Sequence, residues 1–351
     1  MKKSAAMDSL ASKARSGRTE TSDWRASLAN ACRDPLELLA RLNLRPEDVN
    51  LARQTDMSML VPQRLIERMT PGDPNDPLLL QFLPRNEELV ATDGFTSDPL
   101  DEIRSTQAAA SHCDSLLSKY ESRSLIVTAT ACCVHCRYCF RRHFPRKTGD
   151  IQIEEAENAV KSACADRPCR EVVFSGGDPL SLSTSRIAHL LSIANTANQL
   201  RRIRFHTRFP VLLPERISDS LIECLSSPLA AGKSVILVVQ ANHPAEIDDR
   251  AADALHRLAD AGVILLCQSV LLRNINDSVE TLAALFERLI ECRVVPYYLH
   301  QLDRVAGASH FEVPEAWGAR LIDELRERLP GYAVPRYVRE IPGRPSKTVL
   351  R

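Results

Sequence analysis

The chain has 351 residues, 44% of them apolar and 26% charged, and its 45 basic side chains balance 45 acidic ones. The length allows two or three domains or one barrel with an extension, and the zero net charge argues against general binding of nucleic acid or anionic membranes. No apolar run approaches the ~20 residues of a membrane span, and no apolar segment follows the charged N-terminus, so we expect a cytoplasmic protein.

The N-terminal third is predicted to be helical and irregular. Residues 1–22 are rich in Ser, Thr, Ala, Lys and Arg with few large apolar side chains, so we expect a disordered tail. Within residues 23–118, the stretches 34–44 and 60–69 carry apolar residues at helical spacing, and prolines interrupt residues 71–84. A small helical region is therefore expected before the main domain.

Beyond this region the pattern changes to short β-branched runs that alternate with longer amphipathic stretches, as in βα units around a parallel sheet. About six such units favour the α/β class and a partial (β/α)6 barrel over residues 119–312. Residues 313–351 are expected to form a C-terminal helix and a final segment. The expected strands are 124–130, 171–175, 202–207, 234–240, 263–269 and 294–300, and the expected helices include 153–165, 185–197, 245–262 and 278–293.

The chain contains eleven cysteines, an odd number in a protein too large to need disulfide bonds for stability. Most of them have apolar neighbours, where cysteine usually behaves as a small buried apolar residue. We assign no chemistry to the cysteines of this kind, which are Cys32, Cys113, Cys164, Cys169, Cys224, Cys267 and Cys292.

The remaining cysteines lie in one loop after the first expected strand. Cys132, Cys136 and Cys139 have the spacing C-x3-C-x2-C. Three thiolates with His135 or His143 could hold a structural zinc ion, although zinc ligands normally come as two separated pairs. Three thiolates can also hold a [4Fe-4S] cluster with one iron left for a non-protein ligand. The spacing favours the cluster and leaves zinc as the alternative.

The same loop carries a family resemblance. The cysteines with Tyr138 before the last of them look like the cluster motif of radical S-adenosylmethionine (radical SAM) enzymes, which have a partial barrel. Over roughly residues 60–351 the chain resembles the lysine 2,3-aminomutases, and most closely the branch that modifies elongation factor P (EF-P). The resemblance rests on several strings in the same order, which are CRYCFRRHFP, FSGGDPL, RFHTRFPVLLPERIS, QSVLLRNIND, PYYLHQLDRVAGASHF and PSKT.

The resemblance implies a cofactor site at this end of the barrel. Cys132, Cys136 and Cys139 would ligate three irons of the cluster, S-adenosylmethionine would bind the fourth, and Cys133 would stay unligated. The glycine-rich turn after the second strand would approach the cofactor, with its acidic side chain meeting the methionine ammonium. Without the resemblance this turn is better explained as an ordinary βα turn with a helix cap. The implied cofactor-binding residues are Tyr138, Ser175, Gly176, Gly177 and Asp178.

A second cofactor, pyridoxal 5′-phosphate, is implied at the C-terminal segment. Lys347 in PSKT matches the family lysine that forms the Schiff base with this cofactor, although a lone lysine in such a segment is otherwise a solvated charge. Basic and polar side chains would hold the phosphate, and any one of them is otherwise a surface group. The candidates from the matching strings are Lys119, Tyr120, Arg123, Arg208, Arg216 and Gln268.

The substrate residues also follow from the resemblance. Arg141 matches the arginine that binds the α-carboxylate, and Asp303 matches a carboxylate that receives the ε-ammonium. Glu340 stands where the free-lysine enzymes have a second aspartate, which keeps the charge and lengthens the side chain. The alternative for both acidic residues is a surface ion pair. Asn242, His243 and His300 follow or end strands, where they either line the pocket or make ordinary hydrogen bonds.

These features lead to the expectation of an isomerase that converts L-lysine to β-lysine with a [4Fe-4S] cluster, S-adenosylmethionine and pyridoxal phosphate. Its expected partners are a reductant protein and, through the product, EF-P and its lysyl ligase; nucleic acid and membranes are not expected. The alternatives are a catabolic lysine aminomutase, an aminomutase for another amino acid, and a zinc-bearing interaction protein.

Overall fold

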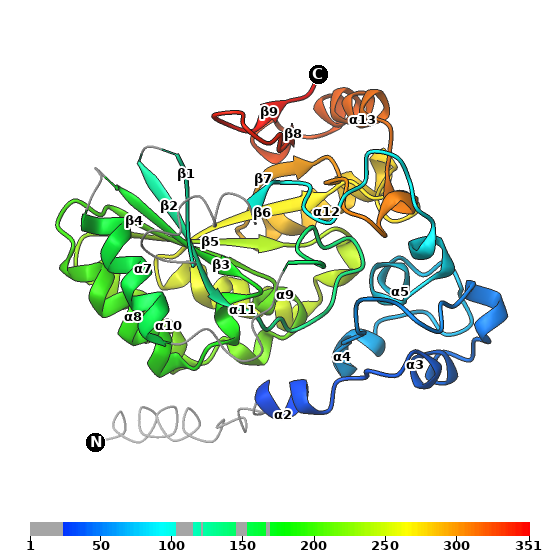
Figure 1. Ribbon diagram of the computed structural model, residues 1–351, viewed down its shortest axis with the longest axis horizontal. Helices are drawn as coiled ribbons and strands as arrows, with labels where there is room; N and C mark the ends of the chain where they lie inside the picture. Colours follow the sequence, from blue (N-terminus) through cyan, green and yellow to red (C-terminus); the bar gives the residue numbers. More distant parts are fainter. Residues whose placement is uncertain (1–23, 103–114, 121, 145–152, 166–168) are drawn as a thin grey trace, which may run out of the picture.

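The computed structural model shows a largely parallel sheet with helices packed along it, and a smaller N-terminal region beside it (Figure 1). Among the described residues, no helix is both long and apolar enough to cross a membrane. The predicted tail, residues 1–22, lies outside this part of the chain. The described residues are 24–102, 115–120, 122–144, 153–165 and 169–351.

Over the described residues the sheet has nine strands in chain order, and no pairing joins β1 to β9, so the barrel is open. Strands β2 to β8 are parallel, and antiparallel strands β1 and β9 flank them. The six predicted strands are confirmed to within one residue as β2 to β7. The strands are β1 Leu116–Tyr120, β2 Arg123–Ala129, β3 Glu171–Gly176, β4 Arg202–Thr207, β5 Ser234–Gln240, β6 Ile264–Val270, β7 Val295–His300, β8 Arg336–Arg339 and β9 Thr348–Val349.

The barrel helices begin where polar side chains cap them. Ser183, Ser218, Asp248 and Ser278 each accept a hydrogen bond from a backbone N–H of the first turn that follows, which satisfies donors that the helix itself leaves unpaired. The four predicted barrel helices and the C-terminal helix are confirmed. The helices are α7 Ile153–Ala165, α8 Thr184–Thr196, α9 Phe209–Leu212, α10 Asp219–Ala230, α11 Asp249–Asp260, α12 Val279–Glu291 and α13 Glu315–Arg328, with 3-10 turns η3 Pro179–Ser181, η4 Pro214–Arg216, η5 Pro244–Glu246, η6 Ser309–Phe311 and η7 Gly331–Ala333.

The N-terminal region consists of short helices, blue to cyan in Figure 1, and α3, η1 and α5 among them start at a proline. Pro35 and Pro77 each stand at the first turn of a helix capped by the preceding aspartate, a position where the missing N–H costs nothing. The predicted domain boundary at residues 118 and 119 falls inside β1, which pairs with β2. The elements are α2 Trp24–Ala29, α3 Pro35–Arg41, η1 Pro46–Val49, α4 Gln63–Ile66, α5 Pro77–Phe82 and η2 Asn86–Leu89.

The two faces of the sheet differ in polarity. Along β4, Ile203 and Phe205 are buried beneath the helices, whereas the alternate residues Arg204 and His206 are only partly buried. Successive side chains on a strand point to opposite faces, so the polar residues lie inside the barrel. Since the carboxyl ends of parallel strands meet at one edge, the loops after β2, β3 and β4 converge at the same place.

Candidate active site

The cysteine loop follows β2 directly. Cys132, Cys136 and Cys139 are partly buried, and Cys139 donates its backbone N–H to the carbonyl of Cys136 at 3.1 Å. Cys133 is fully buried, and burial raises the pKa of its thiol well above the ordinary value. A thiol with a raised pKa is a poor metal ligand at neutral pH, because the thiolate is the form that binds metals. The structure thus separates Cys133 from the three thiols of the motif.

The N-terminal region holds this loop through buried charges. Glu88 accepts hydrogen bonds from Arg137 at 2.6 and 2.8 Å and from Arg142 at 2.8 Å. Arg142 also donates to Asp56 at 2.7 Å. The side chains of Glu88 and both arginines are at most 1% exposed, so each charge depends on these partners for compensation. The loop is therefore oriented by residues outside the barrel, and no motif in the sequence pointed to Glu88.

The glycine-rich turn after β3 lies against the start of the cysteine loop. Gly177 donates its N–H to the carbonyl of Ala129 at 2.7 Å. A Cβ on Gly176 would lie 2.4 Å from that carbonyl oxygen, and one on Gly177 would lie 2.4 Å from the oxygen of Ala131. Gly176 also has φ of +114°, a conformation that favours glycine. These glycines are thus required for the contact between two loops of the site.

The carboxylate of Asp178 points into the fold. It accepts hydrogen bonds from the hydroxyl of Thr207 at 3.0 Å and from the backbone N–H groups of Leu180 at 3.0 Å and Arg208 at 2.7 Å. Burial raises the pKa of Asp178 to about 6. This geometry is the helix-cap alternative of the sequence analysis. It differs from the predicted contact with the methionine ammonium, because the oxygens already bind groups of the chain.

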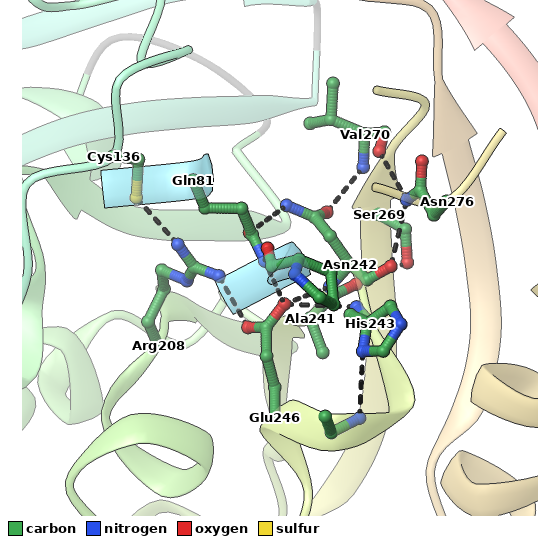
Figure 2. A network of polar contacts seen from close by, with 12 residues as sticks. Gln81, Cys136, Arg208, Ala241, Asn242, His243, Glu246, Ser269, Val270 and Asn276 are labelled. Atoms are coloured by element: carbon green, nitrogen blue, oxygen red, sulfur yellow. Dashed lines mark hydrogen bonds and ion pairs between the residues drawn. The ribbon is translucent and has the colours of Figure 1, made fainter. Parts of the chain in front are cut away.

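Arg208 lies beside the cysteine loop, as Figure 2 shows. Its Nη1 is 2.7 Å from the Sγ of Cys136 and 2.9 Å from the hydroxyl of Tyr138. Its Nη2 donates to the carboxylate of Glu246 at 2.7 Å, and the side chain of Glu246 is fully buried. The prediction that Arg208 binds the phosphate of pyridoxal phosphate therefore needs correction: the guanidinium is directed at the cysteine loop.

Neutral groups complete this network. Asn242 donates to the hydroxyl of Tyr138 at 2.6 Å and to Gln81 at 3.0 Å, and it accepts from the N–H of Val270 at 2.8 Å. Gln81, from α5, donates to Glu246 at 3.2 Å. The network joins strands β5 and β6 to the N-terminal region (Figure 2). Of its members, sequence reasoning identified Tyr138, Arg208 and Asn242 but missed Gln81 and Glu246, whose partners are distant in the chain.

Arg141, directly after the motif, is bound in a two-point ion pair. Its Nε and Nη2 donate to the carboxylate of Glu102 at 2.7 and 2.8 Å. Its Nη1 donates to the hydroxyl of Ser175 at 3.2 Å and to the carbonyl of Gly176 at 3.0 Å. The structure thus places Arg141 at the glycine-rich turn with its carboxylate-binding edge facing Glu102, a residue that the sequence did not single out.

Lys347 lies between β8 and β9, where its ammonium donates to the carboxylate of Glu340 and stands 6.0 Å from the ring centre of Tyr298. Nearby, burial and the charges of Glu340 and Glu102 raise the pKa of Asp303 to about 7, against the opposing charge of Lys347. The two carboxylates predicted to receive an ammonium therefore lie around one lysine. The structure brings Lys347, Asp303 and Glu340 together.

Two histidines inside the barrel complete this part of the site. Burial, with the charge of Lys347, lowers the pKa of His300 to about 3, and burial lowers the pKa of His206 as well. Both imidazoles are thus neutral near pH 7. Within the described part of the chain, the buried Nε2 atoms of both rings have no hydrogen-bond partner. Such atoms are suited to a bound ligand, since buried polar groups are normally paired.

The predicted phosphate residues divide into two groups. Arg123 stacks on Tyr120 with its guanidinium 3.7 Å from the ring centre, and Arg123 and Arg204 oppose the burial that raises the pKa of Tyr297 to about 12. Gln268 stands opposite Tyr298 in the β6–β7 pairing, and the ring centre of Tyr298 is 6.0 Å from the ammonium of Lys347. The side chain of Lys119 lies outside the described residues.

Arg216 belongs to the second group and requires a correction. It donates to the backbone carbonyls of Leu180 at 2.7 Å and Leu182 at 3.0 Å, and to the hydroxyl of Thr184 at 3.2 Å. The residue is 1% exposed. Its donors are used to join the loops after β3 and β4, so the structure gives it no access to a phosphate.

The described residues fit both implied cofactors, the [4Fe-4S] cluster and pyridoxal phosphate. For the cluster, three partly buried thiols lie in one loop, beside a buried guanidinium that contacts one of them. Among the described residues, no three His, Cys, Asp or Glu side chains meet around a single ion, which does not bear on a cluster whose thiolates bind different irons. For pyridoxal phosphate, Lys347 faces an interior with two unpaired imidazole nitrogens.

Comparison with known proteins places these observations in context. Residues 126–286 match the model of the radical SAM superfamily. The chain is 40% identical to the L-lysine 2,3-aminomutase of Escherichia coli over 93% of this chain and 94% of that protein. It is 38% identical to the L-lysine 2,3-aminomutase of Haemophilus influenzae over 94% of this chain and 96% of that protein. The structure of SuiB from Streptococcus suis bound to S-adenosylmethionine covers 68% of this chain and 54% of that one, at 15% identity and a TM-score of 0.48.

Proposed function

The chain belongs to the radical SAM superfamily and, within it, to the family of the L-lysine 2,3-aminomutases, and on this premise we propose that it converts L-lysine to β-lysine. The observation that carries the proposal is 40% identity over 93% of the chain to a protein of that activity. An enzyme of this family is an isomerase, so the alternative of a zinc-bearing interaction protein is excluded.

When bound, the [4Fe-4S] cluster with S-adenosylmethionine supplies a carbon radical from one donated electron, and pyridoxal phosphate supplies a ring that delocalises the unpaired electron. Cys132, Cys136 and Cys139 hold the cluster, and Arg208 donates to the sulfur of Cys136. Cys133 stays a buried thiol. Tyr138 orients Arg208 through its hydroxyl and thereby supports the loop.

Lys347 would hold the second cofactor through its amine, and Arg123, Tyr120 and Gln268 stay candidates for its phosphate, with Gln268 opposite Tyr298 near Lys347. The imidazoles of His206 and His300 offer unpaired nitrogens inside the barrel and, being neutral, add no charge there. The buried interior excludes water from a reactive radical, which would otherwise attack whatever is nearest.

The substrate is recognised by its charges. Arg141 binds the α-carboxylate with its planar donor edge, at the glycine-rich turn that contacts the cysteine loop. Asp303 and Glu340 receive the ε-ammonium; Glu340 already pairs with a cation, and the charge of Glu340 acts on Asp303. Because a buried carboxylate without a cation is costly, an amino acid that lacks the second amine is disfavoured.

We further propose that a ligase uses the β-lysine product to modify EF-P. The proposal rests on the resemblance of the sequence motifs to those of the EF-P branch of the family. The alternative use is lysine catabolism. Deleting the gene should leave EF-P without the mass increment of a β-lysyl group, as measured by mass spectrometry of the intact factor. An unchanged mass favours the catabolic role.

The activity is tested by anaerobic reconstitution with iron, sulfide and pyridoxal phosphate, followed by incubation with S-adenosylmethionine, a reductant and one amino acid at a time. L-lysine should yield β-lysine, whereas L-alanine and L-glutamate, which lack the second amine, should not react. Chromatography of the derivatised amino acids measures the product. Turnover of another amino acid in preference to lysine would contradict the substrate assignment and leave the radical chemistry intact.

A further inference from the structure

The carboxylate-binding edge of Arg141 is occupied by a carboxylate of the same chain. Glu102 accepts from Nε at 2.7 Å and from Nη2 at 2.8 Å, which is the two-point geometry that any free carboxylate would adopt on a guanidinium. The side chains of Arg141 and Glu102 are 12% and 15% exposed, so water screens this ion pair only weakly. A substrate carboxylate can reach this edge only if Glu102 leaves it.

The ammonium end of the proposed lysine site shows the same arrangement. The ammonium of Lys347 is bound by Glu340, the carboxylate proposed for the substrate ε-ammonium. The charges of Glu340 and Glu102 both raise the pKa of Asp303, and that of Lys347 opposes them, so these groups act on one another. An internal carboxylate therefore lies at the donor edge proposed for the substrate α-carboxylate, and an internal ammonium pairs with a carboxylate proposed for the ε-ammonium.

We propose that Glu102 is a substrate-site residue that competes for the donor edge of Arg141 and is exchanged for the α-carboxylate of the incoming amino acid. The inference rests on the proposed role of Arg141. An exchange of one carboxylate for another keeps the charge beside the guanidinium constant, so Arg141 is never left buried without a counter-ion. Glu102 thereby competes with the substrate and sets the affinity for amino acids that carry a carboxylate.

The backbone around Glu102 is compatible with such an exchange. The N–H of Glu102 donates to the carboxylate of Asp98 at 3.0 Å. A few residues earlier, Thr96 exchanges hydrogen bonds with the loop after β7, donating to Arg304 at 2.9 Å and accepting from Ala306 at 2.9 Å. These contacts do not involve the carboxylate of Glu102. Release from Arg141 thus requires a side-chain rotation and leaves the backbone contacts in place.

The test measures binding without turnover. Full-length protein, reconstituted with iron, sulfide and pyridoxal phosphate but without S-adenosylmethionine, is equilibrated by dialysis with labelled L-lysine or with 1,5-diaminopentane, which is lysine without its carboxylate. Glu102→Gln should bind L-lysine about tenfold more tightly than the parent, because the partly buried carboxylate that competes for Arg141 has been removed. Its affinity for 1,5-diaminopentane, which does not need Arg141, should change much less than its affinity for L-lysine. Glu102→Ala should behave in the same way and serves if the glutamine variant folds poorly.

Two controls separate this competition from other effects. Glu312→Gln removes a carboxylate that pairs with Arg304 at 2.8 Å, in the loop next to Thr96, and should leave both affinities unchanged. In Arg141→Gln, L-lysine should lose affinity and 1,5-diaminopentane should not, which tests the proposed function by itself.

The outcomes are distinct. If the parent binds L-lysine and neither Glu102 variant binds it more tightly, the exchange is refuted while the substrate assignment stands. Equal gains for L-lysine and 1,5-diaminopentane also refute it, since a general change of charge would then explain the data. If no form binds L-lysine, the substrate assignment fails and the exchange fails with it.

Discussion

The two ends of the site are built from different interactions. Around Cys136 the polar groups of Gln81, Asn242 and Glu246 are fully buried and bonded to one another and to Arg208. At the other end of the site, Lys347 and Glu340 form an ion pair whose side chains are 27% and 11% exposed, and Arg141 and Glu102 form one whose side chains are 12% and 15% exposed. A buried network of many hydrogen bonds fixes one geometry, whereas ion pairs near solvent can exchange partners. The cluster end is thus rigid, and the amino-acid end is adaptable.

The largest effect is expected at the rigid end. Cys136→Ala removes a proposed cluster ligand and should abolish both the brown chromophore and all turnover, measured by iron and sulfide content and by β-lysine formation. Cys133→Ala is the matched control, because its thiol is buried and has a raised pKa. It should keep both properties. A colourless Cys133→Ala protein would show that the ligands have been assigned wrongly.

The next largest effect is expected in the buried hydrogen-bond network around Arg208. Glu246→Gln leaves the guanidinium of Arg208 buried without its carboxylate and should lower the free energy of unfolding by about 3–5 kcal/mol. Denaturant titration of the full chain measures it. Glu280→Gln, which removes an exposed pair with Arg328, should change the midpoint little. Similar midpoints for the two variants would mean that the buried network contributes no more to stability than an exposed ion pair does.

At the adaptable end, substitution should affect turnover and not assembly. Asp303→Asn should lower the conversion of lysine about a hundredfold, because a buried ammonium loses a carboxylate partner. Iron content, pyridoxal phosphate absorbance and uncoupled cleavage of S-adenosylmethionine should stay near parent values. Asp323→Asn, at an exposed pair on α13, is the control and should leave turnover unchanged. Parent-like turnover in Asp303→Asn would remove this residue from the substrate site.

The smallest effect concerns pH. Burial raises the pKa of Asp303 to about 7, so the carboxylate ionises near neutrality and lysine binding should strengthen as the pH rises through about 7, by at most tenfold per unit. Stability changes in the opposite sense: the folded state favours the protonated acid, and that contribution is lost as the pH rises toward about 7. The dependence of lysine affinity on pH should become weaker in Asp303→Asn. The same pH profile in that variant would assign the titration to another group.

Much of the fold could be predicted because its strands are continuous apolar runs. The stretch SVILVVQ, for example, became β5 without change, since a parallel strand is buried on both faces. Strands β1, β8 and β9 were missed because LLSKY, RYVR and TV are short and mixed in character. Only the edge hydrogen bonds supplied by their neighbours make them strands.

Some residues of the site could be predicted from the sequence and others could not. The cysteine spacing is local and could be found, but Lys347 depended on family resemblance, because nothing in PSKT itself distinguishes it from a surface lysine. Arg208 and Arg216 were placed at the wrong task because a long guanidinium side chain can point in many directions. The role of Glu246 could not be predicted from the sequence, since its partner Gln81 lies 165 residues away in the chain.

The ion pairs of Glu88 with Arg137 and Arg142 have a consequence for maturation of the protein. A barrel begun at β1 would lack Glu88 and Asp56 and would carry two buried guanidinium groups without counter-ions. The cysteine loop would then have no fixed path. We therefore expect cluster insertion in the cell to wait until the N-terminal region has docked, so that delivery of iron and sulfide is coupled to completion of the fold.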